Sequence, residues 1–353
     1  MTTSDPTKLK MTKEIGLPNI AFCVARVPNS GRLIFGSSDF KLYEIDVLAE
    51  KPQPVAFNGE GHQSYVTGVV LCAPNIAVSG SYDGKLSWWD IEKREPIRTV
   101  SAHELWIRRL AVSPDGKTIA SVADDMQCKL WNAETGELLR QFSDHKPITP
   151  HDFPSMLFAV TFSPDGKFVA TGDKIGHVAI WETDSGTKVA TVDAPTLYTW
   201  DPRQRRHSIG GIRSLAFSPD SKLLAVGGTG QIGNIDHLEA SARIEIFDWQ
   251  AGQPVREIVN EKFKGLVEHH VFDPTAQWLL SSGGDNGGFV AFHNVETGKT
   301  LHQDKAPMHV HQFALNESYD TLFAVGHHKI AVFEFKADAP KPAEAAAPAA
   351  VTN

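Results

Sequence analysis

The sequence predicts an all-β fold, a seven-bladed β-propeller whose blades are four-stranded antiparallel sheets. Seven apolar stretches each end in a large residue followed by a polar one, and these endings lie 44, 42, 50, 66, 45 and 41 residues apart. A spacing of about 40–45 residues with such an ending is typical of a propeller blade. The endings are Ile45-Asp46, Trp89-Asp90, Trp131-Asn132, Trp181-Glu182, Phe247-Asp248, Phe292-His293 and Phe333-Glu334.

The unit between residues 61 and 100 shows how one blade is built. Strands are predicted over residues 66–71 and 76–79, a third strand ends at Trp89, and a fourth covers residues 96–100. Short strands divided by turns rich in Gly, Pro and Asp indicate an all-β protein. Pro presets φ in such turns, while Gly and Asp accept positive φ. Matching turns recur at residues 113–116, 163–166 and 218–221.

The ends of the chain predict how the ring closes. After Phe335 the sequence offers no good fourth strand, whereas residues 8–12 read like the last strand of other units. We therefore expect the N-terminal segment to complete the seventh blade, which would remove an exposed sheet edge. The propeller then spans residues 8–336, with a flexible N-terminus over 1–7 and a disordered Ala/Pro-rich tail over 337–353.

Two units carry a further pattern of polar residues. In both, an Asp follows a Ser by four residues and precedes a Trp by six. Together with the period and the turns, this pattern resembles the WD-repeat (WD40) family over roughly residues 8–336. The resemblance implies that His, Ser, Asp and Trp form a hydrogen-bonded chain that locks each blade, as buried polar groups require partners. The sets are His62, Ser79, Asp83 and Trp89, and His103, Ser121, Asp125 and Trp131.

The other units depart from this pattern. The fourth keeps Thr171 and Trp181 but has Ile175 at the position of the Asp. The first ends in Ile45, and the last three end in phenylalanines, whose rings donate no hydrogen bond. We expect packing, more than the polar chain, to hold these blades.

Composition argues against several classes of function. The net charge of −8 argues against a general nucleic-acid binder or a protein that docks on anionic membranes. The three cysteines, Cys23, Cys72 and Cys128, form no CxxC pair and read as buried thiols in a reducing compartment. No secretory signal and no apolar run long enough to span a membrane is visible. A cytoplasmic protein is the expectation, and no cofactor is expected.

Three insertions lengthen the repeat around the fourth and fifth blades. They cover residues 145–155, 193–211 and 229–242. In a four-stranded meander, the b–c turns and the d–a connections share one face, and all three insertions are of these two kinds. Long loops on a rigid frame often carry function. The second insertion holds residues that suit recognition: Tyr198, Trp200, Arg203, Arg205, Arg206 and His207. Alternatively, the two aromatic residues anchor the loop on the propeller, and the arginines belong to a solvated loop.

The same face is expected to hold the mouth of the central channel. The resemblance places the residues three and five positions after His62 and His103 there, and aligning the turns extends the set to the other blades. A mixture of aromatic, Arg and acidic groups predicts a scaffold that binds a protein or peptide partner, and acidic groups on that partner would suit the arginines. The predicted partner-binding residues are Tyr65, Tyr82, Trp106, Arg108, Phe158, Trp200 and Arg213; the wider rim adds Ile20, Phe22, Thr67, Asp124, Met156, Glu268, His309 and His311.

Rival functions rest on weaker signals. His309 and His311 lie on one side of a predicted strand and Glu268 can approach them, so the alternative is a metal-dependent enzyme with a site at the channel mouth. A purely structural subunit of a larger assembly is a third hypothesis.

The run 228–233 matches GxGxxG, but no helix is expected after it, so we interpret it as a flexible loop. No nucleophile elbow, P-loop or HExxH motif is present.

Overall fold

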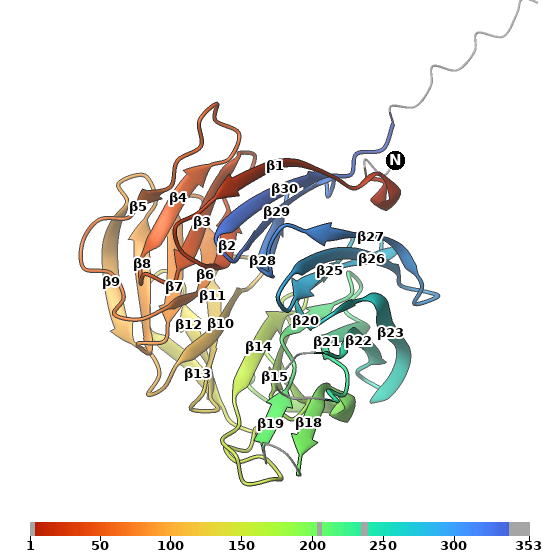
Figure 1. Ribbon diagram of the computed structural model, residues 1–353. Helices are drawn as coiled ribbons and strands as arrows, with labels where there is room; N and C mark the ends of the chain where they lie inside the picture. The colour runs from red at the N-terminus through yellow and green to blue at the C-terminus, as the bar shows by residue number, and fades with distance from the viewer. Residues whose placement is uncertain (1–3, 203–206, 234–238, 339–353) are drawn as a thin grey trace, which may run out of the picture.

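The computed structural model describes residues 4–202, 207–233 and 239–338. In this part of the chain, seven four-stranded antiparallel sheets stand around a central axis (Figure 1). The innermost strand of each sheet contacts the innermost strands of both neighbouring sheets, which closes a ring. The predicted seven-bladed propeller is confirmed. Among the described residues, no helix is long and apolar enough to cross a membrane.

The blades follow one another along the chain, each beginning at the central axis. The first blade has β2 (Ala21–Arg26), β3 (Arg32–Ser37), β4 (Leu42–Asp46) and β5 (Val55–Ala56). The second has β6 (Val66–Ala73), β7 (Ile76–Ser81), β8 (Lys85–Asp90) and β9 (Glu95–Ser101). The third has β10 (Ile107–Val112), β11 (Thr118–Ala123), β12 (Cys128–Asn132) and β13 (Leu138–Phe142), and the fourth β14 (Leu157–Phe162), β15 (Phe168–Asp173), β16 (His177–Glu182) and β17 (Lys188–Asp193).

The remaining blades repeat this order. The fifth has β20 (Ser214–Phe217), β21 (Leu223–Thr229), β22 (Ser241–Asp248) and β23 (Gln253–Lys264). The sixth has β24 (Leu266–Phe272), β25 (Trp278–Gly284), β26 (Gly288–Asn294) and β27 (Thr300–Ala306). The seventh has β28 (Val310–Leu315), β29 (Thr321–Gly326) and β30 (Lys329–Glu334), and is completed by β1 (Lys10–Gly16).

The chain ends meet in the seventh blade. Strand β1 pairs antiparallel with β30, as the sequence predicted, although it begins two residues later and runs further than residues 8–12 (Figure 1). Within residues 1–7, for which we predict a flexible N-terminus, Ser4 bridges to Lys336 and the Asp5 amide donates to the Phe335 carbonyl at 2.7 Å. Residues 1–3 and most of the predicted 337–353 tail lie outside the described residues.

The core lies between neighbouring blades. Each apolar cluster draws its side chains from two adjacent sheets; for example, Trp278 and Phe292 of the sixth blade pack with Phe333 and Phe335 of the seventh. Such continuous burial explains why the blades that end in Phe need no polar group at that position.

Hydrogen bonds add locks inside several blades. In the second blade, His62 Nε2 and Trp89 Nε1 lie 2.7 and 2.8 Å from Ser79 Oγ, and His62 Nδ1 lies 3.0 Å from Asp83. The third blade has the same arrangement at similar distances, with His103, Ser121, Asp125 and Trp131. In the second blade, the Ser79 hydroxyl thus connects the His62 ring, in the loop before the blade, to the Trp89 indole on the third strand.

The fourth blade corrects our expectation that packing replaces the lock. His145, which we placed in an insertion, bonds Asp173 at 2.9 Å and Thr171 at 2.8 Å. Asp173 stands two residues before Ile175, and its side chain accepts the amide of Ile175. A shorter hydrogen-bonded set therefore exists, from which Trp181 is missing: its Nε1 has no hydrogen-bond partner within the described residues.

The GxGxxG match is not a dinucleotide site. It begins inside β21, and the next element in the described part of the chain is β22, so the described residues have no helix after the glycines, which a βαβ unit would require.

Candidate functional site

An irregularity common to the inner strands builds the channel mouth. In six of the seven blades, the pairing of the inner strand with the next shifts by one residue near its start, and the unpaired residue is left outside the ladder. Such a β-bulge re-aims a side chain. The extra residues are Phe22, Thr67, Arg108, Phe158, Glu268 and His311.

These bulged residues surround one cavity of about 180 Å³. In the fifth blade, Arg213 takes the equivalent place directly before β20. The complete lining is Phe22, Thr67, Tyr82, Arg108, Arg109, Phe158, Arg213, Glu268 and His311. Four of the predicted partner-binding residues, Tyr82, Arg108, Phe158 and Arg213, are therefore brought together.

A continuous series of aromatic rings covers one side of this mouth. We call Phe22, Tyr65, Phe40, Tyr82 and Trp106 the aromatic arc. Tyr65 contacts Phe22, Phe40 and Tyr82 with ring centroids 5.4 to 5.8 Å apart, and Tyr82 stacks on Trp106 at 4.6 Å. Trp106 is 49% exposed, and Tyr65 and Phe40 are both 41% exposed. Large apolar surfaces that remain open in this way mark interaction sites.

Arg108 ties the aromatic arc to the cavity. Its guanidinium lies over the rings of Tyr82 and Trp106, at 4.8 and 5.2 Å from the centroids. Two of its nitrogens contact the carboxylate of Asp124 at 2.8 and 2.7 Å, and a third donates to the Tyr82 hydroxyl. Burial acts to lower the pKa of Arg108, but Asp124 and Tyr82 outweigh it and raise that pKa. Arg108 therefore organises the surface and is already neutralised.

Arg213 and Arg109 differ from Arg108 because, among the described residues, neither has a bidentate carboxylate partner. The Arg213 guanidinium lies 3.8 Å from the centre of the Phe158 ring, and its Nε finds no hydrogen-bond partner within the described residues. Arg109 donates to the carbonyls of Arg213 and Glu268 at 3.4 and 3.1 Å. Burial lowers the pKa of both guanidinium groups. The cavity thus holds cationic groups with unused capacity for an anion.

The three insertions contact one another. The 193–211 segment folds into a hairpin of β18 (Tyr198–Asp201) and β19 (His207–Gly210), a structure that we had not expected for it (Figure 1). Trp200 stacks on His151 of the 145–155 segment at 4.6 Å, and Gln231 of the 229–242 segment donates to the Tyr198 carbonyl at 2.8 Å. The insertions therefore share one face and hold one another.

Trp200 is separated from the other predicted partner-binding residues. Its ring contacts within the described residues are with His151 and Phe153, so it anchors the hairpin. This geometry corresponds to the anchoring interpretation of Tyr198 and Trp200. Arg203, Arg205 and Arg206 lie outside the described residues.

Blades six and seven contribute a cluster of potential metal ligands. One ligand atom from each of Glu268, His309 and His311 lies within 4.8 Å of the other two. Burial raises the pKa of Glu268, but His309, Arg213 and His311 outweigh it and lower that pKa to about 2. Burial lowers the pKa of His311 to about 3. The three residues on which the hypothesis of a metal-dependent enzyme rests therefore lie close together.

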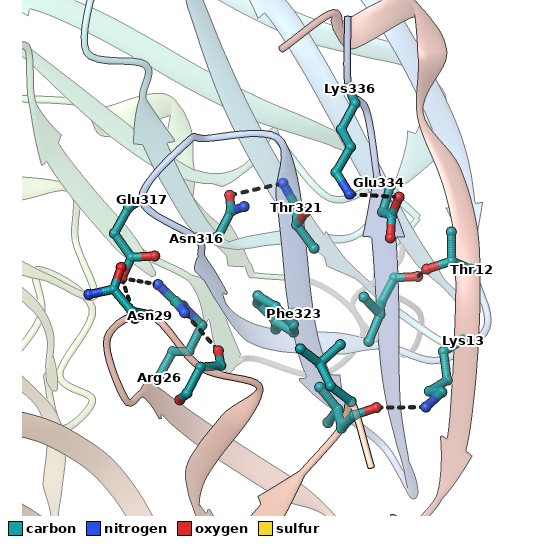
Figure 2. A pocket seen from close by; sticks show the side chains of 14 residues that line it. Thr12, Lys13, Arg26, Asn29, Asn316, Glu317, Thr321, Phe323, Glu334 and Lys336 are labelled. Atoms are coloured by element: carbon teal, nitrogen blue, oxygen red, sulfur yellow. Dashed lines mark hydrogen bonds and ion pairs between the residues drawn. The ribbon is translucent and has the colours of Figure 1, made fainter. Parts of the chain in front are cut away.

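A larger pocket, of about 460 Å³, lies at the seam between the first and seventh blades (Figure 2). Its cationic groups are already paired. Lys13 donates to the Val47 carbonyl at 2.7 Å, Arg26 donates to the Ser30 carbonyl at 2.8 Å and also pairs with Glu317, and Lys336 pairs with Glu334. We interpret this pocket as a structural crevice where the ring closes.

Sequence reasoning missed Arg109, because strict alternation along a strand sends it away from the side that Arg108 occupies. The bulge between Ile107 and Arg109 breaks this alternation, so both arginines reach the channel. Phe40 was also missed. It takes the position in the β3–β4 turn that Gly84 has in the β7–β8 turn of the second blade, and a large ring is not expected where that blade has glycine. The backbone of Phe40 has a positive φ of 75°, the same value as that of Gly84.

Comparison with known proteins identifies the class. Four segments, residues 54–90, 94–132, 136–182 and 200–232, match the WD40 family, described as "WD domain, G-beta repeat". Together with the seven four-stranded blades, these matches place the chain in the WD40-repeat family of seven-bladed propellers.

Several curated proteins are similar to the chain. Telomerase protein component 1 of Rattus norvegicus is 26% identical over 254 residues, which is 70% of this chain and 8% of that protein. The guanine nucleotide-binding protein subunit beta of Oryza sativa subsp. indica is 28% identical over 202 residues, 56% of this chain and 50% of that protein. Apoptotic protease-activating factor 1 of Rattus norvegicus is 27% identical over 169 residues, which is 48% of this chain and 13% of that protein. The chain thus spans half or less of the length of these relatives.

Proposed function

We propose that the protein is a cytoplasmic, non-catalytic scaffold that docks a segment of a partner protein over the channel mouth, on the face that bears the b–c and d–a loops. WD40 propellers generally act as protein-interaction scaffolds, which supports the coarser part of this proposal. The observation that carries the finer part is the exposed aromatic arc next to a cationic cavity.

Aromatic side chains provide the anchoring contacts. Tyr and Trp bury large, rigid surfaces at low entropic cost and are enriched among residues that dominate binding energy. Tyr82 is already held by its stacking on Trp106 and by its contact with Arg108, so little ordering is left to be done when a partner binds.

An acidic group of the partner would complete the site. Arg108 is satisfied by Asp124, so the anion would contact Arg213, whose Nε has no partner within the described residues. Lys174 supports this role: its burial and the nearby Arg213 lower its pKa, and its Nζ reaches the Pro154 carbonyl at 3.4 Å. A buried carboxylate would relieve the repulsion between these cations.

Selection of peptides from a random display library on the full chain tests the proposal. We expect enriched peptides to carry Asp, Glu or a free carboxylate next to an apolar residue. Their Kd should rise about 30-fold with Trp106→Ala plus Tyr65→Ala, corresponding to about 2 kcal/mol for loss of anchoring residues.

Leu139→Ala is the matched control, because Leu139 is 48% exposed on β13, at the outer edge of the third blade. Its Kd should equal that of the unmodified protein. Selected peptides that bind the Trp106/Tyr65 double variant as tightly as the unmodified protein would show that the arc is not the docking surface.

A further inference from the structure

The cluster of Glu268, His309 and His311 has a feature that a docking surface does not require. His309 is 7% exposed, and its Nε2 has no hydrogen-bond partner within the described residues. The Nε2 of His311 also lacks one there. Buried polar atoms without partners are rare in folded proteins and call for an explanation.

The second nitrogen of His309 determines what faces Glu268. His309 Nδ1 lies 2.9 Å from the backbone carbonyl oxygen of Asp285. A carbonyl only accepts, so Nδ1 carries the proton, and the Nε2 of a neutral ring presents a lone pair. That lone pair lies 3.6 Å from Oε1 of Glu268, which is also an acceptor. Two acceptors at this distance repel one another unless a cation lies between them.

We propose that Glu268, His309 and His311 bind a divalent transition-metal ion, of which Zn²⁺ is the best fit. Two imidazole nitrogens and one carboxylate oxygen are a ligand set that zinc prefers. Bonds of about 2.0–2.1 Å in tetrahedral geometry separate ligand atoms by about 3.3 Å. The 3.6 Å between His309 Nε2 and Glu268 Oε1 requires only a small adjustment to reach this value.

The surroundings of the cluster support the same assignment. The hydrogen bond from His309 Nδ1 to a carbonyl is the contact that usually orients a metal-bound histidine. Glu268 and His311 are bulged residues of β24 and β28, so rigid sheets hold both ligands.

A fourth coordination position would open into the cavity, because Glu268 and His311 both line it. Arg109 and Arg213 line the same cavity, and their positive charges disfavour an additional cation unless an anion accompanies it. We therefore expect an anion as the fourth ligand. The competing occupant of the gap is a proton on His309 Nε2, which would form an ion pair with Glu268.

Metal titration distinguishes these two occupants. The full chain, stripped of metal with a chelator, is titrated with ZnCl₂ by calorimetry and with CoCl₂ by visible absorption. We expect one equivalent of Zn²⁺ per chain and the intense absorption of a tetrahedral cobalt site. Each of His309→Gln, His311→Gln and Glu268→Gln should weaken binding by more than the roughly 10–100-fold that loss of a supporting hydrogen bond costs.

His207→Ala is the control for adventitious binding, since His207 is an exposed histidine on β19. It should bind Zn²⁺ like the unmodified protein. Absence of Zn²⁺ binding, or equal binding by the unmodified protein and the three Gln variants, would overturn the proposal and favour the proton. Should a variant fail to fold, the cobalt spectrum of the unmodified protein decides: the spectrum of hydrated cobalt alone would overturn the site.

Discussion

Arg109 of the third blade donates a hydrogen bond across the channel to the backbone carbonyl of Glu268 in the sixth blade, at 3.1 Å. Its guanidinium also reaches the Arg213 carbonyl of the fifth blade at 3.4 Å. One partly buried side chain thus connects the third blade to the fifth and sixth blades, and its charge lies near the Glu268 carboxylate.

Replacement of Arg109 is expected to destabilise the ring. Arg109→Met removes a cation that faces the partly buried Glu268 and leaves two carbonyls without their donor, so we expect the free energy of unfolding to fall by about 3–5 kcal/mol. Urea unfolding measures this change. The control, Arg140→Met on exposed β13, should change stability by less than about 0.5 kcal/mol. Equal effects of the two substitutions would contradict the bridging role.

Two tryptophans at equivalent positions give a matched test of the blade locks. Trp89 Nε1 donates to Ser79 Oγ at 2.8 Å, whereas Trp181 Nε1 has no hydrogen-bond partner within the described residues. Trp89→Phe should therefore cost about 1 kcal/mol more than Trp181→Phe, because only the former loses a hydrogen bond. Thermal or urea unfolding of both variants gives the difference. A larger cost for Trp181→Phe would refute this account of the lock.

Acid should weaken the fold through two buried histidines. Burial lowers the pKa of His270 and His293 from 6.5 to about 4. Between these values the unfolded chain binds the extra protons, so the stability that is complete above pH 6.5 is lost as the pH falls toward 4. The limit is about 3 kcal/mol per histidine.

Urea unfolding at pH 7.0 and pH 5.0 measures this dependence. His177 and His309 have raised pKa values and act in the opposite direction, so the contribution must be isolated with a variant. His270→Gln should show a smaller loss of stability between the two pH values than the unmodified protein. An unchanged difference would mean that His270 does not titrate in this range.

The insertion hairpin should loosen without unfolding the ring. Trp200→Ala removes the stacking on His151 and the tilted ring contact with Phe153 that hold β18 and β19 beside the fourth blade. Hydrogen exchange of residues 198–201 and 207–210 should become faster, while the midpoint of thermal unfolding stays within a few degrees. Faster exchange throughout the fourth and fifth blades would show instead that the hairpin supports the whole ring.

Loss of the closing strand should change the state of association. Deletion of residues 1–16 removes β1 and leaves the polar backbone of β30 unpaired at a sheet edge. We expect the truncated chain to form larger species than the full chain in light scattering after gel filtration. A truncated chain with the same mass and unfolding midpoint as the full chain would show that β1 is dispensable for closure.

The sequence was sufficient for the architecture because each blade repeats the same apolar spacing and turn chemistry. The endings at Trp89, Trp131 and Phe333 all fall within third strands or their equivalents, β8, β12 and β30. The strand that closes the ring could also be predicted, because the residues after Phe335 do not read as a strand and residues 8–12 do.

The candidate site was less accessible to sequence reasoning. The side chain of Arg109 reaches the channel only because of a bulge. In the fourth blade the Asp of the hydrogen-bonded set is Asp173, two positions before Ile175, where it was expected. Both are effects of register, which side-chain periodicity does not reveal. The separation of Trp200 from the aromatic arc depends on how insertions fold over one another. Contacts between loops distant in the sequence leave no periodic signal.

The bulges at the inner strands also have a consequence for how such a protein changes over time. Because Phe22, Thr67 and the other extra residues stand outside the ladder pairing, each can be exchanged without altering the register of its sheet. The frame and the chemistry of the opening are thus separable. A descendant of this chain could acquire a new ligand preference by single substitutions at these positions, with little demand on the folding of the ring.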